Sequence, residues 1–143
     1  RHIFNNLTYY KIIYMNKILV EVSVGELLDK ISILEIKKEK IKDNAKLKLI
    51  SEEYTILNEQ FNKKVKIDKN LENLIVSLKE INSKLWLIED EKRVCEKNKD
   101  FSEKFIELSR NVHFLNDERA KIKLDINNYT GSKIKEVKEY KSY

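Results

Sequence analysis

Hydrophobic residues recur three and four positions apart along most of the chain, a spacing that predicts amphipathic α-helices. Short polar breaks separate four stretches that carry this pattern. With no proline and two glycines, the chain lacks the turn residues of an all-β fold. We therefore predict an all-α protein with helices at about Val24–Lys42, Ala45–Asn62, Leu71–Cys95 and Phe101–Asn128.

Residues that cap helices stand at several of these predicted ends. Ser23 and Glu26 have the S-x-x-E spacing of a capping box, and Asp100 with Glu103 forms a second candidate. Gly131 suits the end of the last helix, where a left-handed residue costs glycine least.

The third and fourth stretches predict a long antiparallel hairpin. Each holds an apolar seam that alternates steps of three and four, and only about five residues join them. A turn near Asn98 places residue i opposite roughly residue 197 − i, which brings Leu108 to Ile88 and Arg119 to Leu78. Both seams fall into register together in this arrangement, which supports the hairpin.

The N-terminal helices should cover this hairpin. Ile33 and Ile36 lie off the main apolar stripe of the first helix, so that helix has apolar residues on more than one side and is expected to be sandwiched. We expect a bundle-like fold in which both N-terminal helices pack on the hairpin. Residues 18–23 alternate in the manner of a strand, and we expect them to pair with the C-terminal tail as a minor two-stranded ribbon.

The two ends of the chain differ from the helical part. Residues 1–14 (RHIFNNLTYYKIIY) have no helical stripe, whereas Met15 opens a stretch that reads like a natural start. We expect residues 1–14 to be a non-native or disordered extension, residues 15–131 to be a single helical domain, and residues 132–143 to be a charged tail.

The net charge of +5 does not by itself predict a nucleic-acid-binding protein. Lysine supplies most of the 29 basic residues and is interleaved with Glu and Asp along the helices. Such mixing is typical of an ordinary solvated surface, so nucleic acid is disfavoured as a partner. No apolar run reaches the roughly 18 residues of a membrane span, and we expect a cytoplasmic protein. The single cysteine, Cys95, excludes an intrachain disulfide.

Arg119 is the most informative candidate residue, because it occupies a seam position whose neighbours are aliphatic. An arginine there either extends along its stem to solvent or is buried with a partner. The first helix offers Asp29, Glu35 and Glu39 as partners, and a bound anion is the alternative.

A polar strip leads up to Arg119 along the same helix. Arg110, His113, Asn116 and Asp117 lie three and four residues apart, so they line a pocket or form a solvated flank. His113 has no second histidine or cysteine near it in the helices, so we expect no metal site.

A second cluster surrounds Trp86. The indole either fills the gap between the hairpin and the first helix or belongs to a site together with Glu89. Glu89 and Asp90 point about 100° apart on a helix, so they do not form a catalytic pair. No catalytic or nucleotide-binding fingerprint is present, so a non-catalytic protein is favoured over an enzyme and no cofactor is expected.

Three segments resemble an uncharacterised bacterial family of short helical proteins of unknown function. They are VSVGELLDKISILEIKKEKI (22–41), KLWLIEDEKRVCEKNKDFSEKFIELSRNVHFLNDERAKIKLDIN (84–127) and TGSKIKEVKEY (130–140). The resemblance implies an association with genes for cell-surface polysaccharide synthesis and supplies no established catalytic residues.

Two hypotheses for function follow. The first is a non-catalytic helical adaptor or accessory protein linked to cell-surface polysaccharide biosynthesis, with a protein partner or self-association. The alternative is a protein or enzyme that binds a small anionic metabolite, a sugar phosphate or nucleotide sugar, between the first helix and the hairpin. The candidate residues for a ligand or partner are Glu35, Trp86, Glu89, Arg110, Asn116, Asp117 and Arg119. The metabolite hypothesis requires that no carboxylate of the first helix already neutralises Arg119.

Overall fold

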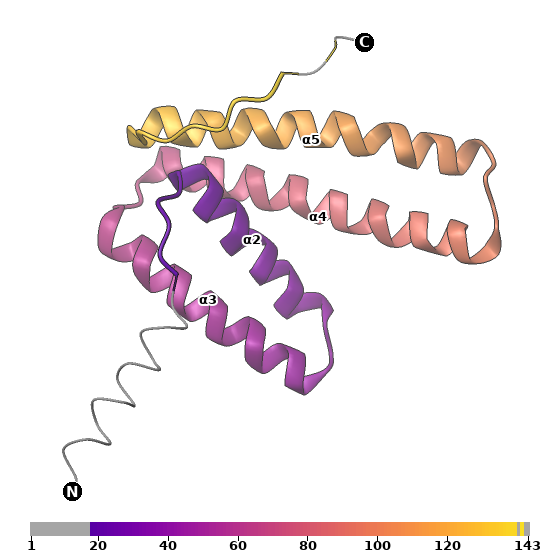
Figure 1. The fold of residues 1–143 in the computed structure, drawn as a ribbon, viewed down its shortest axis with the longest axis horizontal. Helices are drawn as coiled ribbons and strands as arrows, with labels where there is room; N and C mark the ends of the chain where they lie inside the picture. Colours follow the sequence, from indigo (N-terminus) through magenta and orange to yellow (C-terminus); the bar gives the residue numbers. More distant parts are fainter. Residues whose placement is uncertain (1–17, 140, 142–143) are drawn as a thin grey trace, which may run out of the picture.

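The described part of the chain folds into four α-helices, as the hydrophobic pattern predicts (Figure 1). The computed structural model describes residues 18–139 and 141. Its helices are α2 (Val24–Lys40), α3 (Asn44–Lys64), α4 (Lys69–Asn98) and α5 (Glu103–Thr130). Each helix end lies within three residues of the end expected from the sequence. The predicted extension at residues 1–14 lies outside the described residues.

Side-chain caps set most of the helix starts. The Ser23 hydroxyl accepts a hydrogen bond from the Glu26 amide at 3.1 Å, as the capping-box spacing predicts. The start of α5 differs from the prediction, because its N-cap is Ser102 and not Asp100. Asp100 instead accepts a hydrogen bond from the Ser102 amide at 3.1 Å, which delays the helix to Glu103. Gly131 ends α5 in the left-handed conformation with φ of 68°.

Helix α2 lies at the centre of the arrangement. It packs against α3 on one side and against both α4 and α5 on the other, while α3 packs on α2 alone. Ile36 is therefore almost completely buried, which confirms the sandwiched first helix. Helices α4 and α5 form the predicted antiparallel hairpin. An ion pair of 3.4 Å between Lys104 and Glu91 agrees with the expected register.

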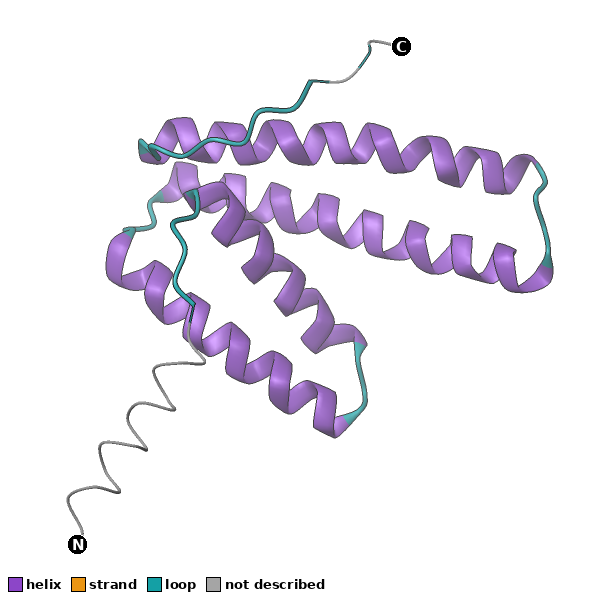
Figure 2. Ribbon diagram, viewed as in Figure 1, coloured by secondary structure: helices purple, strands orange, loops and turns teal. Residues whose placement is uncertain are grey.

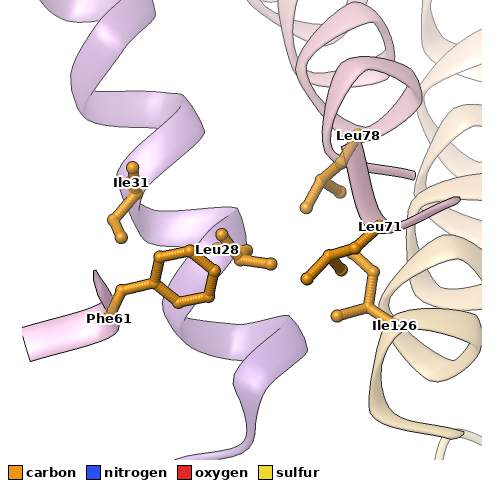
Figure 3. Close-up of a cluster of buried hydrophobic side chains, with 6 residues drawn as sticks. All are labelled: Leu28, Ile31, Phe61, Leu71, Leu78 and Ile126. Atoms are coloured by element: carbon orange, nitrogen blue, oxygen red, sulfur yellow. The ribbon is translucent and has the colours of Figure 1, made fainter. Parts of the chain in front are cut away.

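The hydrophobic core gathers where α4 begins and α5 ends. Figure 3 shows its buried side chains converging from all four helices, and they are Leu28, Ile31, Phe61, Leu71, Leu78 and Ile126. The other end of the hairpin, which carries its turn, extends beyond α2 and α3 (Figure 1). The core thus fixes one end of the hairpin and leaves the other packed mainly on itself.

The expected ribbon between residues 18–23 and the C-terminal tail is wrong. No strand occurs among residues 18–139 and 141 (Figure 2). Ile18, Leu19 and Val20 are largely exposed, and the tail runs back along α5 as an irregular segment. The two segments meet instead through a hydrogen bond of 3.4 Å from the Val24 amide to the Ser132 hydroxyl. In this same part of the chain, no helix has the length and apolar character needed to cross a membrane.

Candidate functional site

A buried lysine organises the interface of α2, α5 and the tail. The side chain of Lys123 is 8% exposed, and its ammonium lies 2.6 Å from the Glu26 carboxylate and 3.1 Å from that of Glu136. Asp29 adds a third carboxylate at 3.6 Å. Burial alone would lower the pKa of Lys123, but the hydrogen bonds to Glu26 and Glu136 outweigh it and raise the pKa. Lys123 is therefore held in its charged form.

An asparagine on α4 extends this polar cluster. The Asn82 amide nitrogen donates to Asp29 at 2.7 Å and to the Ser32 hydroxyl at 2.8 Å. Its amide oxygen then accepts from the Arg119 guanidinium at 3.4 Å. Asn82, which lies one helical turn along α4 from the expected neighbour Leu78, thereby connects Arg119 indirectly to Asp29.

Arg119 has no carboxylate partner among the described residues. Asp29 is occupied by Lys123 and Asn82, while Glu35 and Glu39 both pair with Lys79 at 3.1 and 2.8 Å. The Nε atom of Arg119 is buried and has no hydrogen-bond partner. Leaving such a donor unmade costs about 1–3 kcal/mol. Arg119 thus has a buried donor without a partner in this part of the chain. Its charge acts on Glu136 from beyond ion-pair distance and, after the hydrogen bond from Lys123, contributes to lowering the pKa of that carboxyl.

Arg119 lies in the wall of a pocket between α2 and the hairpin. The pocket has a volume of about 300 Å³. Its apolar wall comes from α2 and α4, and polar side chains from α4 together with Arg119 of α5 complete it. The lining residues are Ile33, Ile36, Asn82, Leu85, Trp86, Glu89, Asp90, Arg93 and Arg119. This places Trp86, Glu89 and Arg119, three of the predicted site residues, around one cavity.

A second cavity lies on the other side of Arg119, between α5 and the tail. It has a volume of about 590 Å³. Its lining residues are Val112, His113, Asn116, Asp117, Arg119, Lys138 and Lys141. We call it the tail groove. Arg119 is common to both cavities, and the predicted residues Asn116 and Asp117 belong to the tail groove.

Two predicted site residues join neither cavity. Arg110 is exposed on α5 and lines neither of them. Glu35 faces α3 and α4 instead, where it accepts a hydrogen bond from the Tyr54 hydroxyl at 3.3 Å and pairs with Lys79. Arg110 and Glu35, which the metabolite hypothesis groups with Arg119, therefore do not meet Arg119 around one pocket.

The polar residues that follow Arg119 along α5 at the α2–α5 interface were not predicted from the sequence. Lys123 was indistinguishable from a surface lysine, yet it follows Arg119 by four residues and so shares its face of α5. Asn127 lies another four residues along the same face, and its side-chain oxygen accepts a hydrogen bond from the Gly25 amide at 2.7 Å. Polar residues at 119, 123 and 127 beside an apolar seam were the available signal.

The fold and this site together define a small all-α protein with a charged, partly buried cluster where its hairpin meets α2. The chain belongs to a family of unknown function, DUF6165, whose model matches residues 18–143. The comparison with curated proteins and the comparison with solved structures found no match. No group of three or more His, Cys, Asp or Glu side chains in the described part of the chain is placed to hold a metal ion.

Proposed function

We propose that this protein binds a small anionic metabolite of the sugar phosphate or nucleotide sugar class in the pocket between α2 and the α4–α5 hairpin. The observation that carries the proposal is the state of Arg119. It lies in the pocket wall, its Nε has no partner, and no ion pair joins it to a carboxylate of the described residues. An anion that enters the pocket supplies the missing charge.

The orientation of Arg119 argues against the alternative that it only extends to solvent. Its Nη1 donates to Asn82, a residue that is 4% exposed. The guanidinium is therefore turned inward toward the polar cluster. Arg119 is half-buried, and the partner that its guanidinium has among the described residues is a neutral amide oxygen at 3.4 Å.

The remaining walls of the pocket suit the uncharged part of such a ligand. Trp86 is partly exposed there and offers a face on which a sugar ring or a base can stack. The carboxylates of Glu89 and Asp90 accept hydrogen bonds from hydroxyl groups, and Arg93 supplies a second cation. The volume of about 300 Å³ is at the lower end of the range for ligand pockets.

The test is calorimetric titration of the full chain with a hexose phosphate, a nucleotide sugar and the uncharged hexose. We expect the two anions to bind and the hexose to bind far more weakly. Arg119→Gln should weaken binding at least about thirtyfold, the effect of truncating one partner of a desolvated charge pair. Arg110→Gln removes the same charge from the same helix outside both cavities and should leave binding unchanged. Equal losses in both variants, or no binding of either anion, would count against the proposal.

A second candidate is the adaptor or accessory role, and exposed apolar residues near the free end of the hairpin favour it. Leu87, Val94, Phe101 and Ile106 are each about half exposed there. Such residues gather where proteins meet partners. Sedimentation of the wild type and of Val94→Glu tests self-association through this end. A monomer in both cases would remove this support from the second candidate.

A further inference from the structure

The C-terminal tail is attached to the helices by a series of polar contacts. Ser132 accepts a hydrogen bond from the Val24 amide, and the Lys135 ammonium donates to the Asn128 side chain at 2.7 Å. Glu136 then pairs with the buried Lys123 at 3.1 Å. These contacts hold the tail along α5, as Figure 1 shows.

Because Glu136 is fixed, the residues that follow it are delivered to the tail groove. Lys138 and Lys141 line the groove opposite Arg119. The groove therefore has three permanent positive charges in its lining against the single carboxylate of Asp117. Lys138 also forms an ion pair of 3.7 Å with one oxygen of Glu136, whose other oxygen accepts from Lys123, so Glu136 offsets part of the charge of Lys138.

From this placement we propose that the tail groove binds the phosphate or diphosphate group of the ligand, with Lys138, Lys141 and Arg119 as its cationic contacts. This inference rests on the proposed function and assigns the ligand's two parts to two cavities. Arg119 lies in both walls, and the inference requires a ligand that reaches past its side chain, with the sugar against Trp86 and the phosphoryl group in the groove.

The charge of the two cavities supports this division. The pocket beside Trp86 is lined by two carboxylates and two arginines, so its formal charges cancel. The tail groove has an excess of cations, and Asn116 adds a neutral amide donor. A phosphate group carries up to two negative charges and several acceptor oxygens, so it needs several donors arranged around it. Only the groove offers that excess among the cavities that Arg119 lines.

Inorganic pyrophosphate is the direct probe, because it carries the charge without the sugar. We expect the full chain to bind one pyrophosphate, with NMR shift changes at His113, Asn116, Lys138 and Lys141. Lys138→Gln/Lys141→Gln should weaken binding by about a hundredfold, tenfold for each charged contact at 1.4 kcal/mol. Lys63→Gln/Lys64→Gln removes the same charge from exposed positions at the end of α3 and should change affinity less than twofold.

Several outcomes would overturn the inference. They are no binding at millimolar pyrophosphate, equal losses in the two double variants, or shift changes away from the groove. The helical signal in circular dichroism checks the fold of each variant. The variant Lys138→Arg/Lys141→Arg keeps both charges and should retain most of the pyrophosphate binding.

Trp86→Ala separates this inference from the proposed function. We expect it to weaken binding of a hexose phosphate and to leave pyrophosphate binding intact. If hexose phosphate binding depends on Arg119 and Trp86 but not on the tail lysines, the groove assignment fails and the proposed function stands. If pyrophosphate binds through the lysines and sugar phosphates bind no more tightly than pyrophosphate, the groove remains an anion site and the proposed function fails.

Discussion

The ammonium of Lys123 and the carboxylate of Asp29 face each other across the α2–α5 interface at 3.6 Å, and each side chain is only 8% exposed. Glu26 and Glu136 complete the surroundings of the ammonium. This one lysine therefore joins α2, α5 and the tail, and it is the ion-pair partner of Asp29, one of the carboxylates that the sequence offered to Arg119. The candidate site depends on this arrangement.

Lys123→Met should destabilise the fold strongly. The substitution keeps the stem of the side chain but leaves Asp29 buried without its cation, for which we expect a loss of about 3–5 kcal/mol. Urea unfolding followed by circular dichroism measures the loss. Lys121→Met, on an exposed face of the same helix, should change stability by less than about 0.5 kcal/mol.

The double variant Asp29→Asn/Lys123→Met tests the cause of that loss. Because Asp29→Asn removes the orphaned charge, it should recover part of the stability that Lys123→Met loses. Purely additive losses would show that packing, and not the buried charge, accounts for the effect.

Gly25→Ala should also destabilise the protein, although alanine is the better helix former. An added Cβ would lie 2.5 Å from the Lys123 carbonyl oxygen and 2.9 Å from the Asn127 side-chain oxygen. The intrinsic preference for alanine favours the substitution by about 1 kcal/mol. We expect the clash to exceed this gain and to produce a net loss of about 1–3 kcal/mol in thermal or urea unfolding. A stabilised variant would mean that α2 can shift away from α5 without cost.

The free energy of unfolding should be constant over a range of pH that ends where Glu136 is protonated on the acid side and where Lys123 is deprotonated on the alkaline side. The hydrogen bond from Lys123 lowers the pKa of Glu136 from its ordinary value of 4.5, so its contribution is complete above that value and is lost as pH falls. The pKa of Lys123 is raised from 10.5, so its contribution is complete below that value and is lost at higher pH. Unfolding measured from pH 3 to 6 should show a shallower acid decline in Glu136→Gln than in the wild type. Identical slopes would contradict this role of Glu136.

The helices could be predicted from the sequence because their signals are local. Spacing of apolar residues located all four, and the matching seams of α4 and α5 indicated the hairpin. The start of α5 was misplaced because Asp100 and Ser102 are both good capping residues. Which of them becomes the N-cap depends on the conformation of the turn. The predicted ribbon is absent because alternating apolar and polar residues in 18–23 do not by themselves provide a second strand to pair with.

The site could be predicted only in part, since its residues meet through tertiary contacts. Arg119 stood out because a charge interrupts an apolar seam, and Trp86 and Glu89 share its pocket. Glu35 was an equally good partner by sequence, but its pairing with Lys79 follows from the crossing of α2 and α4. The tail lysines could not be assigned to the site, because their position depends on the anchor between Glu136 and Lys123.

Arg119→Met should show whether Arg119 serves stability or ligand binding, because the two roles predict opposite effects on unfolding. Without ligand, Arg119 has a buried Nε that lacks a partner and a long bond to Asn82, so its removal relieves an unsatisfied group. We expect unfolding of the variant to show unchanged stability or a gain of about 1 kcal/mol. The same variant should lose the binding of sugar phosphates and of pyrophosphate. Gains in stability at the expense of binding are typical of functional sites.

Arg110→Met is the matched control for this prediction. It removes an exposed arginine from the same helix and should change neither stability by more than about 0.5 kcal/mol nor the affinity for either anion. A loss of 2 kcal/mol or more in Arg119→Met alone would instead identify Arg119 as a structural residue. In that case the guanidinium stabilises the junction of α4 and α5, and the case for an anion site at this position is lost.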